Sequence, residues 1–165
     1  MRRASLLAVT VLLVFAGSAS AQPGWCAGID KAQVGSLLGA AVPAPLQAGP
    51  ERDEDSGGVN TTCAFVASPK GVVAIRVEFA SAAEARKHVS IEYLKNQQQN
   101  DEDVKYVEEK GIGDRAFWAV SDEGAFYAIL QGARLYGVGL GGMDGKVAAS
   151  KKPAILKLVQ SLLGS

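Results

Sequence analysis

Three short segments near the C-terminal end of the chain limit its fold most strongly. Residues Arg115 to Val120, Ala125 to Gln131 and Arg134 to Leu140 have the pattern of strands, and turns at 122–124 and 132–133 separate them. Consecutive strands joined by turns this short pair with their neighbours as a meander. This part of the chain therefore predicts an antiparallel sheet.

Three further segments, Thr61 to Ala67, Val72 to Phe79 and a short one near Val104 to Glu108, extend the predicted sheet. The second of them alternates cleanly between apolar and charged positions. One face of it carries Val73, Ile75, Val77 and Phe79, and the other carries Arg76 and Glu78. Because side chains alternate across a strand, this pattern predicts a half-buried strand with one wet side.

Capping signals predict three helices. Asp30 and Gln33 form a capping box before a short helix that Gly39 ends, and Ser81 and Glu84 form another before a helix to about Gln97. A last helix carries the apolar residues Ile155, Leu158, Val159 and Leu162, with Pro153 in its first turn if Ser150 is the cap. We therefore expect an α+β fold with about six antiparallel strands, about three flanking helices and one disulfide.

The segment from Ala40 to Asn60 is rich in proline, glycine and charge. Pro43, Pro45 and Pro50 argue against any regular element there, so we expect a loop. The run from Glu51 to Asp55 within it is interpreted as a solvated acidic loop. It departs from the calcium-loop pattern after two positions, which argues against a cation site.

The N-terminal residues have the three parts of a secretory signal peptide. Arg2 and Arg3 precede an apolar run from Leu6 to Ala16, and small residues at Ala19 and Ala21 offer a cleavage site. An uncleaved anchor and a lipid anchor are the alternatives, but the apolar run is short and Pro23-Gly24-Trp25 before Cys26 is a poor lipobox. We predict a signal peptide over 1–21 and one domain over 22–165, periplasmic or secreted, with no stable membrane span after cleavage.

Two cysteines, Cys26 and Cys63, remain after cleavage, and an even count in an oxidising compartment favours a disulfide. A redox or metal pair is the alternative, but C-x-x-C spacing is missing. The trimmed chain would carry 15 basic and 17 acidic residues, a net charge of about −2. Because it lacks a basic excess, we do not expect nucleic acid as a partner.

The candidates for chemistry are few. The chain has one histidine, His88, in a predicted helix, and lacks the Gly-x-Ser-x-Gly elbow that would present a hydrolase serine. Gly137 to Gly142 matches G-x-G-x-x-G, but the match overlaps the last strand rather than a β-α-β turn. Paired carboxylates of the glycosidase kind remain an open alternative. We predict no catalytic, cofactor-binding or metal-ligating residue.

Several features together resemble small exported bacterial domains, including actinobacterial lipoproteins of unknown function and the PsbP-like fold. The resemblance rests on Cys26 and the helix after it, on residues 61–65, on Gly111 to Ala116 and on the apolar closing helix. It implies a binding, sensing or assembly role without a shared catalytic set. The missing lipobox departs from the pattern.

These observations lead to the functional prediction of a non-enzymatic binding, sensing or accessory domain of the bacterial cell envelope. Its partner would be an envelope protein or a small ligand. A small secreted inhibitor or interaction protein, acting through the loop from Glu51 to Asp55, is the first alternative. An envelope hydrolase is the second, and it would need a pocket where His88 or paired carboxylates converge.

Overall fold

The computed structural model describes residues 24–97 and 104–164, so the predicted signal peptide lies outside the described residues. Seven strands form one sheet: β1 Leu46–Arg52, β2 Val59–Ala67, β3 Lys70–Glu78, β4 Lys105–Glu109, β5 Arg115–Ser121, β6 Gly124–Gln131 and β7 Arg134–Gly141. A 3-10 helix and five α-helices accompany it in the described ranges: Trp25–Gly28, α1 Lys31–Leu38, α2 Ala82–His88, α3 Ile91–Gln97, α4 Gly145–Ser150 and α5 Lys152–Leu162.

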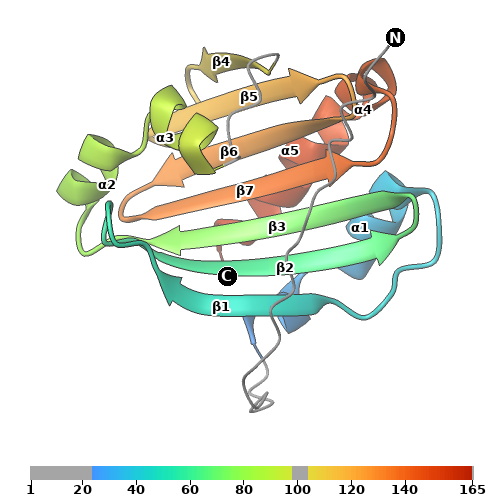
Figure 1. Ribbon diagram of the computed structural model, residues 1–165, viewed down its shortest axis with the longest axis horizontal. Helices are drawn as coiled ribbons and strands as arrows, with labels where there is room; N and C mark the ends of the chain where they lie inside the picture. The colour runs from blue at the N-terminus through green and yellow to red at the C-terminus, as the bar shows by residue number, and fades with distance from the viewer. Residues whose placement is uncertain (1–23, 98–103, 165) are drawn as a thin grey trace, which may run out of the picture.

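All neighbouring strands are antiparallel, in the order β1-β2-β3-β7-β6-β5-β4 (Figure 1). The predicted hairpins and meander are present, and β3 pairs with β7 after the chain has passed through α2, α3 and the far edge strand β4. The α+β class and the antiparallel sheet are confirmed. The expected six strands and three helices are too few.

The seventh strand, β1, corrects the prediction of a loop from Ala40 to Asn60. It is an edge strand, exposed along its whole length, so proline there removes no bond to an outer neighbour. Its pairing with β2 shifts register between Ala48 and Glu51, where Gly49 has a φ of 88° and Pro50 follows. A bulge at an edge therefore accommodates Pro50, whereas Pro43 and Pro45 lie before the strand begins.

The single helix predicted from Ser81 to Gln97 is two helices. Ser81 accepts a hydrogen bond from the Glu84 amide at 3.1 Å, as the capping box predicts, but α2 stops at His88. Ser90 then accepts a bond from the amide of Tyr93 at 3.1 Å, and the Arg115 guanidinium donates to the Val89 carbonyl. A second capping serine and a bond from a distant strand interrupt the helix at a point that its periodicity does not mark.

The closing segment is also two helices. Ser150 does not cap the last one, because its hydroxyl donates back to the Val147 carbonyl at 2.7 Å within α4. Lys151 precedes the first turn of α5, and Pro153 lies in that turn as predicted. None of the helices within 24–97 and 104–164 is long and apolar enough to cross a bilayer.

One face of the sheet, which we call the back face, is covered by α1, α4 and α5 (Figure 1). Its core includes Phe65, Tyr127 and Leu158, all fully buried, and the apolar stripe of α5 points into it. Cys26, in the 3-10 helix, forms a disulfide with Cys63 of β2, and the Arg76 guanidinium lies 5.2 Å from the Trp25 ring centroid. The N-terminal segment is therefore bound to this face.

The opposite face, the front face, is covered differently. Helices α2 and α3 pack on one end of it, over Val77, Phe79 and Phe117. As a result β3 has no single wet side, which corrects that prediction. Its first half buries Val72 and Ala74 under the back helices, and its second half buries Val77, next to Phe79 just after the strand, under the front ones.

Candidate functional site

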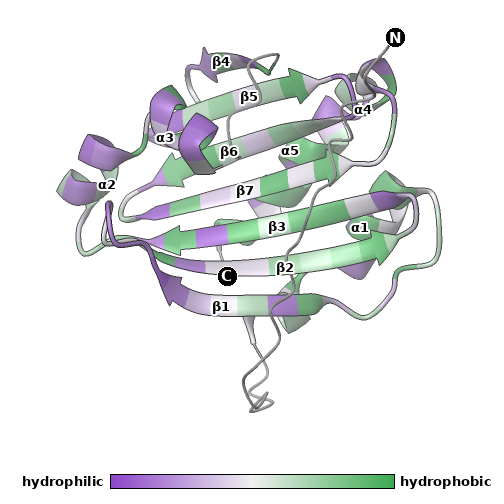
Figure 2. Cartoon of the chain, in the orientation of Figure 1, coloured by the Kyte–Doolittle hydropathy of each residue, from purple (hydrophilic) through white to green (hydrophobic). Residues whose placement is uncertain are grey.

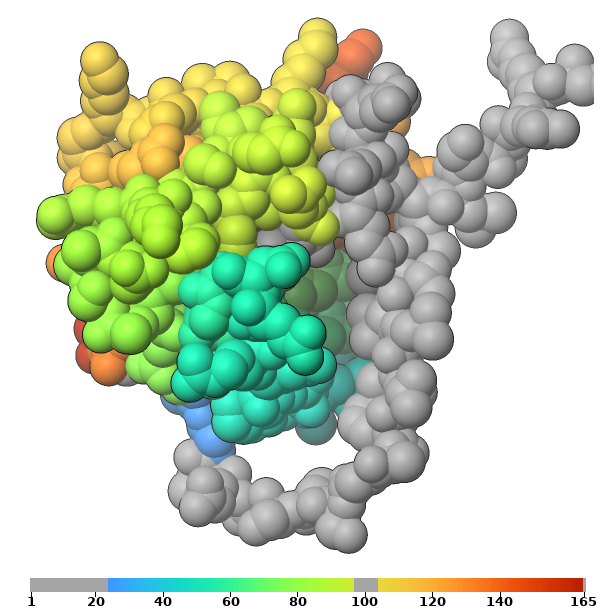
Figure 3. Space-filling model, turned by 60° about the vertical axis from the view of Figure 1, so that its left-hand side comes forward, coloured from blue at the N-terminus to red at the C-terminus, as the bar shows by residue number. Residues whose placement is uncertain are grey.

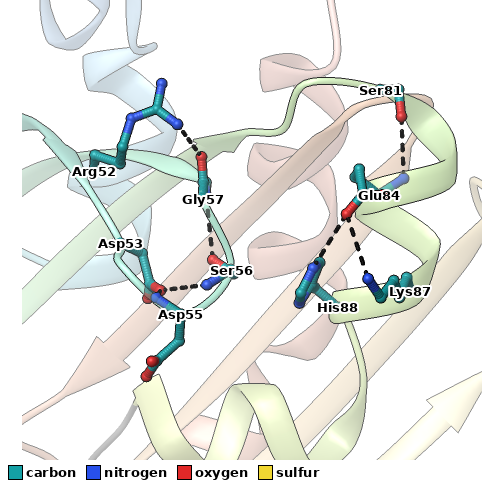
Figure 4. Close-up of polar contacts among 10 residues, drawn as sticks. Arg52, Asp53, Asp55, Ser56, Gly57, Ser81, Glu84, Lys87 and His88 are labelled. Atoms are coloured by element: carbon teal, nitrogen blue, oxygen red, sulfur yellow. Dashed lines mark hydrogen bonds and ion pairs between the residues drawn. The ribbon is translucent and has the colours of Figure 1, made fainter.

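The predicted chemical candidates lie apart from one another. His88, on α2, has its Nε2 atom 3.3 Å from a carboxylate oxygen of Glu84, one turn earlier on the same helix (Figure 4). The glycines from 137 to 141 lie inside β7, hydrogen-bonded to strands on both sides, and no β-α-β turn surrounds them within the described residues. The structure therefore does not bring these residues together in one site.

The acidic loop between β1 and β2 folds on itself. The carboxylate of Asp53 accepts hydrogen bonds from the amides of Asp55, at 3.0 Å, and Ser56, at 2.8 Å, while Arg52 donates to the Gly57 carbonyl (Figure 4). Figure 3 shows the loop packed against the α2–α3 segment. Burial raises the pKa of Tyr93 on α3, and a hydrogen bond with Ser56 of the loop opposes that shift. The loop is thus held on the front side of the sheet.

A polar cluster on the back face was not predicted. The Tyr127 hydroxyl donates to a carboxylate oxygen of Glu109 at 2.6 Å, and Lys152 pairs with the other oxygen. The Lys152 ammonium also lies 5.2 Å from the Trp118 ring centroid. Burial alone would raise the pKa of Glu109, but the bonds from Lys152 and Tyr127 and the lysine charge hold it below its usual value. These contacts connect the start of α5 to β4 and β6.

A hollow of about 350 Å³ lies beyond the ends of β5 and β7 and is lined by Asp122, Glu123, Gly142, Met143 and Asp144. Asp144 is not free for chemistry, because its carboxylate caps α4 by accepting from two backbone amides. Figure 1 places α4 and α2 at opposite ends of the molecule, so His88 is remote from this hollow. The described residues contain no group of three side chains arranged to hold a metal ion.

The part of the front face that α2, α3 and the other described helices leave uncovered is the remaining candidate, and we call it the open face. The strand pairings align its residues in three rows across β1, β2, β3 and β7, on the side that carries α2 and α3. The rows are Val66, Gly71 and Gly141; then Leu46, Ala64, Val73 and Gly139; then Ala48, Thr62, Ile75 and Gly137. None of these described residues carries a charge.

The open face is apolar and accessible. Leu46 and Val66 are 45% and 52% exposed, which makes them two of the four large hydrophobic residues that stand out as exposed in the described chain. Val73 and Ile75 beside them are partly exposed. With strands about 4.8 Å apart and same-face residues about 6.8 Å apart, the face covers about 400 Å², a size at which exposed apolar patches are often functional.

The glycines of the open face leave part of the sheet surface without side chains above it. A side chain at Gly137 would meet the Phe126 ring at 2.7 Å, so that ring already fills the space above this glycine. A side chain at Gly139 or Gly71 would meet no atom closer than 3.6 Å. The surface above these two positions is therefore not filled by a neighbouring side chain of the described chain, and another backbone or side chain can approach the sheet closely there.

Acidic residues lie at two opposite corners of the open face. Glu51 pairs with Asn60, two residues before Thr62, and so borders the third row, with Glu54 and Asp55 following in the loop. Asp122 and Glu123 form the turn beyond Gly124, which pairs with Gly141 in the first row. Figure 2 shows the contrast between the hydrophilic β1–β2 loop and the paler or apolar stretches of β2 and β7.

Comparisons with known proteins do not assign a family. No family model matches the chain, and no curated protein matches it. Among solved structures, the extracellular domain of PknH from Mycobacterium tuberculosis is similar with a TM-score of 0.49 and 9% sequence identity, over 82% of this chain and 92% of that chain. The resemblance to PsbP-like domains and actinobacterial lipoproteins therefore stays a prediction.

Proposed function

We propose that this protein is an exported, non-enzymatic binding domain of the bacterial cell envelope, and that the open face is its binding surface. The observation that carries the proposal is an uncharged, apolar, partly exposed area of the front face, beside the end that α2 and α3 cover. Apolar surface of this extent costs free energy when it faces water, and in folded proteins it commonly marks an interaction site.

Two observations support an exported location. The disulfide between Cys26 and Cys63 belongs to an oxidising compartment, and the first 21 residues have the sequence pattern of a signal peptide. The separation of His88 from the carboxylates of the hollow supports a role without catalysis, since acid–base chemistry needs such groups within reach of one substrate.

A protein partner fits the open face better than a small molecule does. Small ligands bind in concave sites that cover most of their surface. The open face is instead the surface of a sheet, and the hollow beside Met143 lies beyond its end. A flat apolar area of this kind suits a partner that brings its own extended apolar surface.

Site-specific photocrosslinking in cells that make the protein tests the proposal. A photoreactive residue at Val66 should give an adduct of one discrete mass, whereas the same residue at Val107 should not. Val107 is the matched control because it is also 52% exposed and lies on the back face of β4. The adduct at position 66 should disappear when Val73→Asp is added. Equal adducts at both positions, or an adduct that survives Val73→Asp, would contradict the proposal.

A further inference from the structure

We infer that the partner of the open face is a cationic amphipathic helix: a helix with an apolar stripe and basic residues near both of its ends. This inference rests on the proposed function, since it names the partner class of the same surface. It is carried by the arrangement of charge, in which an uncharged area lies between acidic residues at two opposite corners.

The middle of the partner must be apolar. A charged side chain placed on the open face would lose water and find no opposite charge among Leu46, Val66, Val73 and Ile75. Apolar side chains are favoured there because they remove these residues from water and can approach the backbone at Gly139, where no side chain fills the space.

The ends of the partner must be basic. Glu51, Glu54 and Asp55 lie at one corner of the open face, and Asp122 and Glu123 lie at the other; all five are exposed. Potentials of opposite sign across an interface speed encounter and suppress wrong partners. A segment that crosses from one corner to the other and carries lysine or arginine at both ends satisfies both acidic groups.

A second copy of this chain does not satisfy them. A two-fold dimer brings the same surface together from both copies. Because the rows of the open face carry no basic residue, the second copy's open face offers no opposite charge to either acidic corner. The area is also small, because two faces of about 400 Å² bury about 800 Å² in total, below the range of specific stable dimers.

A helix matches the way the rest of the sheet is covered. The back face is covered by α1, α4 and α5, and the far end of the front face by α2 and α3, so among the described residues helices are the elements that pack on this sheet. Its diagonal is about 28 Å, which a helix of about 18 residues spans at 1.5 Å per residue.

A synthetic peptide tests the inference directly. The probe is a fluorescent 18-residue helix with a leucine and alanine stripe and two lysines in each terminal turn, and the control peptide has glutamates in place of those lysines. Anisotropy titration of the purified, disulfide-bonded protein should show micromolar binding of the lysine peptide and binding of the glutamate peptide at least about tenfold weaker. Equal affinity for the two peptides would overturn the inference, and so would no binding of the lysine peptide.

Matched variants locate the binding. Val66→Asp should weaken the lysine peptide about tenfold, whereas Val107→Asp, equally exposed on the other face, should change its affinity less than about twofold. Neutralising one corner with Glu51→Gln and Glu54→Gln should weaken binding about threefold or more. The control for net charge is the double variant Ser36→Lys with Gln160→Lys, at exposed positions on α1 and α5. It changes the net charge by the same amount and should weaken binding of the lysine peptide less.

The outcomes separate this inference from the proposed function. If both peptides bind equally and Val66→Asp weakens both, the surface binds partners but does not select basic ends, so only the inference fails. If Val66→Asp and Val107→Asp act alike, both proposals fail. If the protein instead binds neutral phosphatidylcholine vesicles, or dimerises in sedimentation, and Val66→Asp abolishes either, the occupant is a lipid surface or a second copy and the inference is overturned.

Discussion

The back face of the sheet and the open face share the same strands but differ in burial: helices cover the first and leave the second partly exposed. Val72 is fully buried beneath the back helices, while Val73, the next residue, is partly exposed on the open face. The back face is further held by the disulfide and by the Glu109 cluster. The contrast indicates that the stabilising contacts gather on the back face, while the proposed binding surface adds few of them, so each face can be changed separately.

The disulfide should give the largest effect. Replacing both cysteines, Cys26→Ala with Cys63→Ala, frees a loop with a sequence separation of 37 residues in the unfolded chain. The loop-entropy model then predicts a loss of about 4 kcal/mol in the free energy of unfolding. Denaturant titration measures it. A loss below about 1 kcal/mol would show that the back face does not depend on this bond.

The neighbouring valines give the sharpest comparison of the two faces. Val72→Ala removes two methyl groups from a fully buried site and should cost about 2 kcal/mol of stability. Val73→Ala removes the same groups from a partly exposed site and should cost less than about 1 kcal/mol. The two variants control for each other in chemical denaturation. Equal losses would mean that the open face is part of the core.

The Glu109 cluster should make part of the back-face stability depend on pH. The pKa of the Glu109 carboxyl is lower in the folded protein than in the unfolded chain. The contribution of this carboxylate to the free energy of unfolding is therefore fully present above the unfolded pKa, and it is lost as the pH falls through the folded pKa. Glu109→Gln should therefore cost about 1 kcal/mol at neutral pH, and progressively less as the pH falls below the glutamate's unfolded pKa. A difference between variant and parent that stays constant with pH would contradict this role.

The smallest effect on stability should come from the open face itself. Val66→Asp exposes a charge where the side chain is already 52% exposed, so the free energy of unfolding should change by less than about 0.5 kcal/mol. Thermal melting of this variant beside Val107→Asp measures the change. A large destabilisation specific to position 66 would assign the residue to folding rather than binding.

The sequence was sufficient where structure is local. Turns at 122–124 and 132–133 mark the meander, and Ser81 caps a helix as its pattern indicates. It failed where distant segments decide the outcome. At the break after α2, Arg115 of a distant strand donates to the Val89 carbonyl, and β1 tolerates its proline because it lies at an edge.

The candidate site could not be predicted from the sequence for the same reason. The alternation in β3 predicts that Val73 and Val77 share a face, which is correct, but it does not tell which of them a helix covers. Glu109 and Lys152 are 43 residues apart, so their pairing leaves no mark on either local pattern. The acidic run from Glu51 to Asp55 was visible, whereas its place beside an uncharged face follows from the strand pairings.

The most direct test of a binding role for the open face is a methyl NMR titration of the disulfide-bonded protein with the lysine-ended peptide. Methyl signals of Leu46, Val66, Val73 and Ile75 should shift progressively with peptide. Those of Val72, Val107 and Leu158 should stay within the scatter of the rest of the core. Shifts centred on the back-face residues, or spread evenly over both faces, would contradict the division of the sheet into a stabilising face and a binding face.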